Sequence, residues 1–333
     1  MTSNLAHKNA LRKNYLRVGW ATVAIVLFST LVSIALAVLF EIPALEDFMA
    51  ALTGEYFLLF NEAVVGCAIL VGSLVLLGTE AQAPERKRIS VRAFFAIFAV
   101  CIFLSTVGNY VGQAWTIPYQ IAFGQSSEDI TAVIITQSPW QVALCVGILA
   151  PIIEEFFFRK LLIDRLHKYG EFLAILTSGL LFGLFHQNVG QYFYTFLVGL
   201  VIAYLYCRTG SYPLAVLMHA LFNFFSGVFP SFAIPKVTEF LEKMESMSSL
   251  DALLPLLPDY ALPLLYYGIH ALLLNVLNIL GLVLLLVHLK KLRIKAPAIH
   301  LSVWDTGTNA YLNGGMLTAL ILLFGATGLS LFL

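Results

Sequence analysis

Three short motifs place polar side chains inside apolar stretches of the sequence. A Glu–His pair can hold a water molecule and deprotonate it, and a His–Asn pair can donate hydrogen bonds to a developing oxyanion. Together, such groups suit the hydrolysis of an amide bond. The candidate catalytic residues are, in chain order, Glu154, Glu155, Arg159, His186, His219 and Asn223.

The first motif contains two adjacent carboxylates. Glu155 and Arg159 are four residues apart, so on a helix they lie on one face and can neutralise each other. Glu154 is rotated by about 100° from Glu155 and needs a partner from another helix or a polar cavity. Pro151 frees a backbone carbonyl one turn earlier and can kink the helix towards such a cavity. The alternative interpretation is a structural ion pair beside a protonated glutamic acid.

The other two motifs contribute imidazoles and a carboxamide. His219 and Asn223 are four residues apart, so one buried helix directs both towards the same place. His186 ends an apolar run, and Phe182 lies one turn before it on the same face, where we expect it to pack. The alternative for the His219–Asn223 pair is interhelical hydrogen bonding.

The same residues bear on metal and nucleophile chemistry. The chain has no H-E-x-x-H motif, although Glu154, His186 and His219 could together hold zinc. No Ser or Cys lies in a nucleophile setting beside these groups. We expect the four cysteines to be small, buried apolar residues: Cys67, Cys101, Cys145 and Cys207.

The composition shows what kind of elements must position these residues. Of 333 residues, 60% are hydrophobic and 11% are charged, and the mean hydropathy is +0.88. Soluble domains carry about 25% charged residues. This composition excludes a disordered chain, a collagen-like fibre, a disulfide scaffold and an electrostatic nucleic-acid binder. It predicts an all-α bundle of transmembrane helices.

Nine apolar runs could cross a bilayer, which takes about 20 residues each. Eight is the nearest alternative count, because the fifth to seventh runs are short. We expect the first run to be a retained anchor, since it is too long for a signal-peptide core. Two amphipathic stretches, Ile42–Tyr56 and Lys236–Leu254, are predicted to lie along the outer interface or to form short caps. The nine runs are Val18–Phe40, Phe57–Gly78, Ala93–Gln113, Trp140–Leu162, Phe172–His186, Tyr192–Cys207, Tyr212–Phe229, Leu262–Leu289 and Gly315–Leu333.

The charges predict an orientation for these runs. The chain has 19 basic and 19 acidic residues. With the N-terminus in the cytoplasm, 17 of the 19 basic residues fall on the inner side, as the positive-inside rule requires. Eleven acidic residues fall on the outer side. Three carboxylates remain within the spans, where charge is costly: Glu62, Glu154 and Glu155.

Several other polar residues lie in the predicted spans. We favour a structural role for them, as interhelical hydrogen-bonding groups. His270 and Asn278, about two turns apart, could also line a cavity wall. This set comprises Asn61, Glu62, Asn109, His270, Asn275 and Asn278.

The three motifs, in this order and each on a predicted span, resemble those of the CPBP intramembrane proteases. This family includes the CAAX prenyl endopeptidase and bacteriocin-immunity membrane proteins. The similarity covers about residues 138–230, with 27 residues from Arg159 to His186 and 33 from His186 to His219. No position departs from the motif pattern.

The resemblance implies a role for each motif residue. Glu154 would activate the water with help from His186, and His219 and Asn223 would stabilise the oxyanion. Glu155 and Arg159 would support the site. Both a glutamate mechanism and a metal mechanism are described for the family; we favour the glutamate mechanism without a cofactor, with zinc as the alternative.

The resemblance also predicts organisation and function. We expect spans 1–3 in residues 1–137, a catalytic core in residues 138–230, and spans 8–9 in residues 231–333. The predicted function is an intramembrane endopeptidase of a bacterial cell membrane that acts on membrane-associated peptides or proteins, including prenylated ones, and not on nucleic acid. The alternative is a non-enzymatic immunity or scaffold protein or a small-molecule transporter. A transporter would more often show two similar halves, which this sequence lacks.

Overall fold

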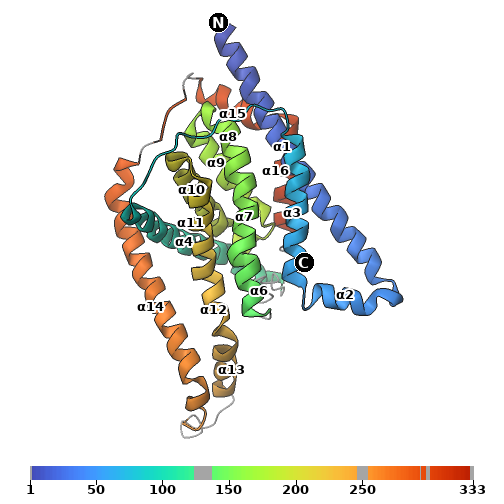
Figure 1. The fold of residues 1–333 in the computed structure, drawn as a ribbon, viewed down its shortest axis with the longest axis vertical. Coiled ribbons are helices and arrows are strands. Elements are labelled where there is room, and N and C mark those ends of the chain that lie inside the picture. Colours follow the sequence, from blue (N-terminus) through green and yellow to red (C-terminus); the bar gives the residue numbers. More distant parts are fainter. Residues whose placement is uncertain (1, 124–136, 246–253, 293, 298–300, 331–333) are drawn as a thin grey trace.

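The computed structural model describes residues 2–123, 137–245, 254–292, 294–297 and 301–330. Within these ranges all regular secondary structure is helical, which confirms the all-α prediction (Figure 1). The α-helices are α1 (Thr2–Phe40), α2 (Glu46–Thr53), α3 (Phe57–Val75), α4 (Val91–Phe123), α6 (Pro139–Leu144), α7 (Ala150–Glu155), α8 (Asp164–Leu166), α9 (Glu171–Phe185), α10 (Val189–Thr209), α11 (Tyr212–Asn223), α12 (Phe229–Ser231), α13 (Ile234–Glu245), α14 (Leu257–His288), α15 (Val303–Tyr311) and α16 (Gly314–Leu329).

Most of the predicted spans are long enough to cross a membrane. Among the described residues, seven helical segments are sufficiently long and apolar, and an eighth is formed if α15 and α16, bent by 72°, count as one span. The described residues therefore contain seven or eight candidate spans, one fewer than the predicted eight or nine. The fifth run forms α9, which has only 15 residues. The last three residues of the ninth run, 331–333, lie outside the described part.

Both amphipathic stretches contain short helices. The first contains α2, and the second contains α13, whereas its residues 246–253 lie outside the described ranges. The phenol of Tyr260 in α14 donates to Glu239 of α13 at 2.6 Å. Hydrogen bonds from Lys236, Tyr260 and Lys243 lower the pKa of Glu239 to about 2. The ionised carboxylate therefore holds α13 beside α14.

The centre of the bundle is α10, which packs between α4 and α9. Glycines allow this approach: a Cβ at Gly108 of α4 would lie 2.5 Å from the Tyr194 Cα of α10, and one at Gly183 of α9 would lie 2.9 Å from the Phe196 Cβ. The Asn188 side chain caps α10 by accepting from the Gln191 backbone N–H at 3.0 Å. This cap fixes the tight turn that follows His186.

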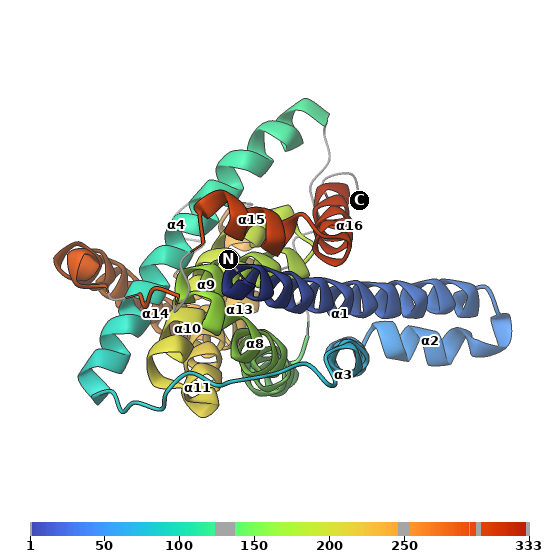
Figure 2. The ribbon, with the colours of Figure 1, turned by 90° about the horizontal axis from the view of Figure 1, so that it is seen from above.

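The outer helices carry the surface expected in lipid. Figure 2 shows α1 extending away from the bundle together with α2. On α1, Leu31, Ile34 and Val38 are each more than half exposed, and Leu262 and Ile279 are equally exposed on α14. Large exposed apolar surfaces of this kind mark a membrane or partner interface. With seven or eight apolar spans, the chain is a multi-pass membrane protein.

Wide π-helical turns interrupt the helices that carry two of the motifs. Such turns often occur at functional sites, because they alter which side chains and carbonyls face a cavity. They lie on both sides of α7 and directly after α11. The three turns are η2 (Cys145–Leu149), η3 (Phe156–Ile163) and η5 (Phe224–Val228).

Candidate active site

Four of the six predicted site residues line one cavity of about 500 Å³. Its walls come mainly from α3, α4, α7, α9, α10 and α11, together with the residues that follow α11. The motifs are far apart in sequence, so the bundle brings them together. The four lining residues are Glu154, His186, His219 and Asn223.

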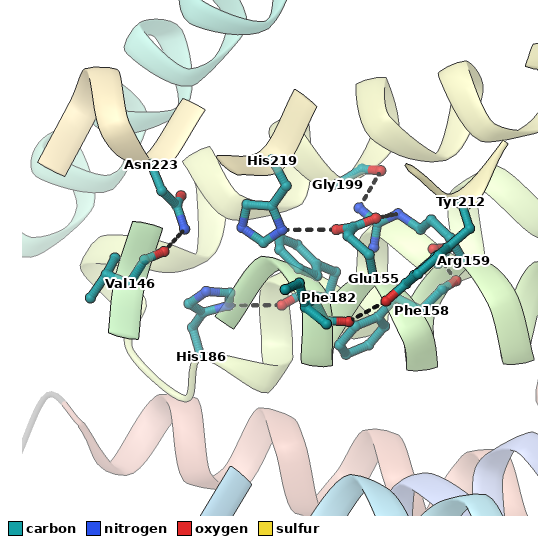
Figure 3. A network of polar contacts seen from close by, with 12 residues as sticks. Val146, Glu155, Phe158, Arg159, Phe182, His186, Gly199, Tyr212, His219 and Asn223 are labelled. Atoms are coloured by element: carbon teal, nitrogen blue, oxygen red, sulfur yellow. Dashed lines mark hydrogen bonds and ion pairs between the residues drawn. The ribbon is translucent and has the colours of Figure 1, made fainter. Parts of the chain in front are cut away.

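The other two predicted residues lie behind this wall, as a buried charged chain. Glu155 and Arg159 are fully buried, and Arg159 Nε lies 3.0 Å from Glu155 Oε2. The other oxygen of Glu155, Oε1, accepts from His219 Nδ1 at 2.9 Å (Figure 3). The sequence predicted the local ion pair but not the contact with His219, which joins positions 64 residues apart. Glu155 therefore links the guanidinium to the imidazole.

Both imidazoles are anchored through the same ring atom. His186 Nδ1 lies 2.9 Å from the Phe182 backbone carbonyl. A carbonyl can only accept, so this nitrogen carries the proton and Nε2 of the neutral ring is an acceptor. His219 uses its Nδ1 to contact Glu155. Each ring thus keeps its Nε2 for a ligand in the cavity.

The Asn223 amide donates to the Val146 carbonyl at 2.8 Å (Figure 3). This carbonyl is available because the π-turn η2 pairs the Ala150 N–H with the Cys145 carbonyl. The next residue, Pro151, has no N–H to offer. The freed carbonyl predicted from Pro151 is therefore held by the Asn223 side chain. One Asn223 N–H and its carbonyl oxygen remain for other partners.

Glu154 differs from its neighbour in having no such anchor. Its Oε2 is buried and lacks a hydrogen-bond partner among the described residues, while the side chain lines the cavity. Helix α7 itself is held in place, because the Tyr212 phenol of α11 donates to the Ile152 carbonyl at 2.7 Å. The carboxylate is therefore presented on a fixed helix with its oxygen unoccupied.

The Phe182 ring contacts both imidazoles and the guanidinium. Its centroid lies 5.2 Å from that of His186 and 5.5 Å from that of His219, both edge to face. The Arg159 Cζ lies over the same ring at 4.7 Å, within cation–π range. The expectation that Phe182 packs is met. The spacing alone could not show that it packs against three of the candidate site residues at once.

Polar residues outside the motifs divide into two groups. His270 was predicted to form an interhelical hydrogen bond, and its Nε2 lies 2.7 Å from the Phe225 carbonyl. In contrast, Asn61, Glu62 and Asn109 line the cavity itself. His270 and Asn278 do not line it. The available signal for Glu62 was a carboxylate inside a span.

The residues do not form a ready-made metal site. In the parts of the chain that the structure describes, no group of three or more His, Cys, Asp or Glu side chains is arranged to hold a metal ion. Glu154, His186 and His219 share the cavity without forming a coordination set. The zinc alternative does not fit this arrangement of side chains.

The fold and the cavity together define a multi-pass helical membrane protein with Glu, His and Asn side chains gathered in a cavity of the bundle. Residues 136–225 match the family described as type II CAAX prenyl endopeptidase Rce1-like. This part of the chain is therefore similar to that peptidase family, which confirms the resemblance seen in the three motifs. The matched residues contain all six predicted site residues.

A curated relative supports the same assignment. The Bacillus subtilis (strain 168) protein named "Putative membrane peptidase YdiL" is 30% identical over 117 residues, or 34% of this chain. The chain spans about half of that relative, covering 48% of its length. No solved structure matches the chain.

Proposed function

We propose that this protein is an intramembrane endopeptidase that hydrolyses a peptide bond of a membrane-associated substrate with a water activated by Glu154. The observation that carries the proposal is the unpartnered Glu154 oxygen in a cavity shared with His186, His219 and Asn223. A buried carboxylate without a partner is costly, so it is retained where it has a task. The family match independently favours peptide hydrolysis.

In the proposed first step, Glu154 removes a proton from water. His186 accepts a hydrogen bond from the same water through Nε2, because its Nδ1–H is engaged by the Phe182 carbonyl. The hydroxide oxygen then bonds to the carbonyl carbon of the substrate, and the carbonyl becomes a tetrahedral oxyanion. This is general base catalysis, which contributes about 10²–10⁴-fold in typical enzymes.

His219 and Asn223 would stabilise that oxyanion. When His219 Nδ1 donates to Glu155, Nε2 can donate only if the ring is doubly protonated. The Glu155 carboxylate stabilises this charged ring, and Arg159 in turn balances Glu155. Asn223 contributes its second N–H, since the first is held by Val146. Donors fixed in advance in this way need little reorganisation during the reaction.

In the second step the peptide bond breaks. The tetrahedral intermediate expels the amine, which takes the proton that Glu154 received from water. The products are a carboxylic acid and an amine, and Glu154 returns to its carboxylate form. The cycle needs no oxidant, reductant or covalent enzyme intermediate.

We further propose that the substrate includes a lipidated peptide, such as a prenylated one. The name of the matching family favours this class. The cavity also combines its polar centre with apolar and aromatic walls, including Phe57, Ile102 and Leu274. A lipid-anchored substrate would reach such a cavity from the bilayer.

The decisive experiment replaces Glu154 by Gln in purified full-length protein. Cleavage of a farnesylated peptide library in detergent would be followed by mass spectrometry. We expect Glu154→Gln to lose at least 100-fold in kcat, while Glu55→Gln, an exposed control before α3, retains full activity. Full activity of Glu154→Gln would overturn the mechanism. A wild-type protein that cleaves nothing would favour the non-enzymatic alternative.

A further inference from the structure

A second carboxylate, Glu62 of α3, lies on the part of the cavity wall that packs against α7. Glu62 is 8% exposed, and its Oε2 is buried without a hydrogen-bond partner among the described residues. It lines the same cavity as Glu154. Glu62 lies outside residues 136–225, which the peptidase family covers.

The packing of α3 places Glu62 towards the reaction centre. Leu58, Glu62 and Gly66 are spaced by four residues and share one helix face. Leu58 packs with Val142 of α6 in a buried cluster. A Cβ at Gly66 would lie 3.6 Å from the side chain of Ile153, the residue before Glu154. Glu62 therefore lies between two contacts that hold this face against α6 and α7.

The charge of the cavity is one-sided. Among the described residues that line it, Glu62 and Glu154 are the acidic side chains, and there is no Lys or Arg. Arg159 lies behind the wall and is paired with Glu155. A carboxylate within the bundle is strongly stabilised by a positively charged hydrogen-bond donor. Apart from the two imidazoles, which the proposed mechanism assigns to the water and the oxyanion, no described side chain of the cavity can provide one.

We propose that Glu62 is a specificity-determining residue that pairs with a basic group of the substrate close to the scissile bond. The inference rests on the proposed peptidase function, because it places the substrate in this cavity. Glu154 acts on the water, while Glu62 holds a positively charged side chain on the α3 side. Peptides with Arg or Lys near the cleaved bond are therefore preferred over neutral peptides of the same shape.

The test uses fluorogenic peptides that differ only in charge. A single Arg or its neutral isostere citrulline is placed at each position around the scissile bond, and kcat/KM is measured with the full-length protein in detergent. At one position we expect wild type to favour Arg by about tenfold or more, the range of a charged hydrogen bond. Glu62→Gln keeps the side-chain size and removes this preference. Glu55→Gln preserves it.

A binding measurement separates this inference from the proposed function. Fluorescence anisotropy compares the same peptides on Glu154→Gln and on the Glu154→Gln/Glu62→Gln double variant, neither of which needs to cleave. We expect the single variant to bind the Arg peptide about tenfold more tightly than the citrulline peptide, and the double variant to bind both equally. If wild type cleaves no peptide while the variants still show this binding pattern, the proposed peptidase function is rejected and the role of Glu62 in binding stands. Equal binding of both peptides by the single variant would overturn the role of Glu62.

Discussion

The polar side chains on two walls of the cavity differ in whether a neighbour holds them by a hydrogen bond. On the wall built by α7, α9 and α11, the two imidazoles and the Asn223 carboxamide are each anchored to a neighbour. On the α3 wall, Glu62 Oε2 has no hydrogen-bond partner among the described residues, and the neighbouring Asn61 is the side chain that hydrogen-bonds to this carboxylate. Anchored groups keep their direction when the substrate arrives. Glu154 is the exception on the first wall, because its buried Oε2 also has no partner among the described residues. In the proposed mechanism, the anchored side chains position the water and the oxyanion, whereas the two carboxylates are left to bind water and substrate.

The free energy of unfolding should respond differently to substitutions on the two walls. Removing one charge of a buried ion pair leaves the other charge uncompensated. An oxygen that has no partner, in contrast, has no hydrogen bond to lose when it is replaced. Substitutions on the two walls therefore differ in their effect on unfolding even where both change a carboxylate into an amide. This contrast can be measured.

The largest effect is expected for Glu155→Gln. It leaves the fully buried Arg159 without its counter-ion and replaces the charged acceptor of His219 by a neutral amide. Losses of about 3–5 kcal/mol are typical for breaking a buried pair on one side. We expect a loss of that size in SDS-driven unfolding of the purified protein in mixed micelles.

The double variant Glu155→Gln/Arg159→Met is the matched control. Removing both charges leaves no unpaired guanidinium in the core, so at least half of the lost stability should return. Activity should stay low in both variants, because His219 lacks Glu155 in each. A double variant less stable than Glu155→Gln would show that the ion pair is not the source of the effect.

These contacts mark the limit of what the sequence could predict. The Glu155–Arg159 pair follows from helical spacing alone, and the chain of apolar runs predicted the membrane bundle. The contacts of His219 with Glu155 and of Asn223 with Val146 depend on how separate helices rotate and approach. The π-turns that free the Val146 carbonyl have no signature in residue spacing, although Pro151 indicated part of the effect.

The same limit explains the differences in fold and site. Apolar length predicted nine runs, but the 72° bend between α15 and α16 depends on the turn around Asn313 and on packing. Glu62 was predicted to form interhelical hydrogen bonds. Nothing in the sequence connects α3 with the motif residues, which begin about 90 positions later. Only the packing of α3 against α7 places it in the cavity.

The second prediction concerns Asn223→Ala. The variant removes the proposed oxyanion donor, and losses of about 10²–10³ in kcat are typical for one such donor. KM should change little, because the interaction is made mainly in the transition state. Steady-state cleavage of the farnesylated peptide measures both quantities.

A carboxamide elsewhere in the bundle provides the comparison. Asn278 of α14 also has an unpartnered oxygen among the described residues, but it does not line the cavity. Asn278→Ala should therefore retain its kcat. Equal losses in the two variants would indicate a general effect on the fold and would remove the case for an oxyanion role of Asn223.

A smaller effect is expected for Phe182→Leu. The leucine keeps an apolar side chain but loses the edge contacts with both imidazoles. We expect kcat to fall about tenfold, equivalent to about 1.4 kcal/mol, with KM nearly unchanged. Phe157→Leu is the control, because Phe157 is equally buried and packs on Phe158. A similar fall in kcat for both variants would argue against a positioning role of the Phe182 ring.

The smallest change in stability is expected for Glu62→Gln. The unfolding free energy should stay within about 1 kcal/mol of wild type or rise, because the substitution breaks no described hydrogen bond at Oε2 and removes the cost of burying a carboxylate. The measurement is the SDS-driven unfolding used for Glu155→Gln, so the same chemical change is compared on the two walls. A loss as large as that of Glu155→Gln would mean that Glu62 is held by a partner within the folded chain, and the two walls would then not differ. An unchanged or increased unfolding free energy would mean that the Glu62 carboxylate does not stabilise the fold. This is the behaviour expected of a group retained to bind a ligand.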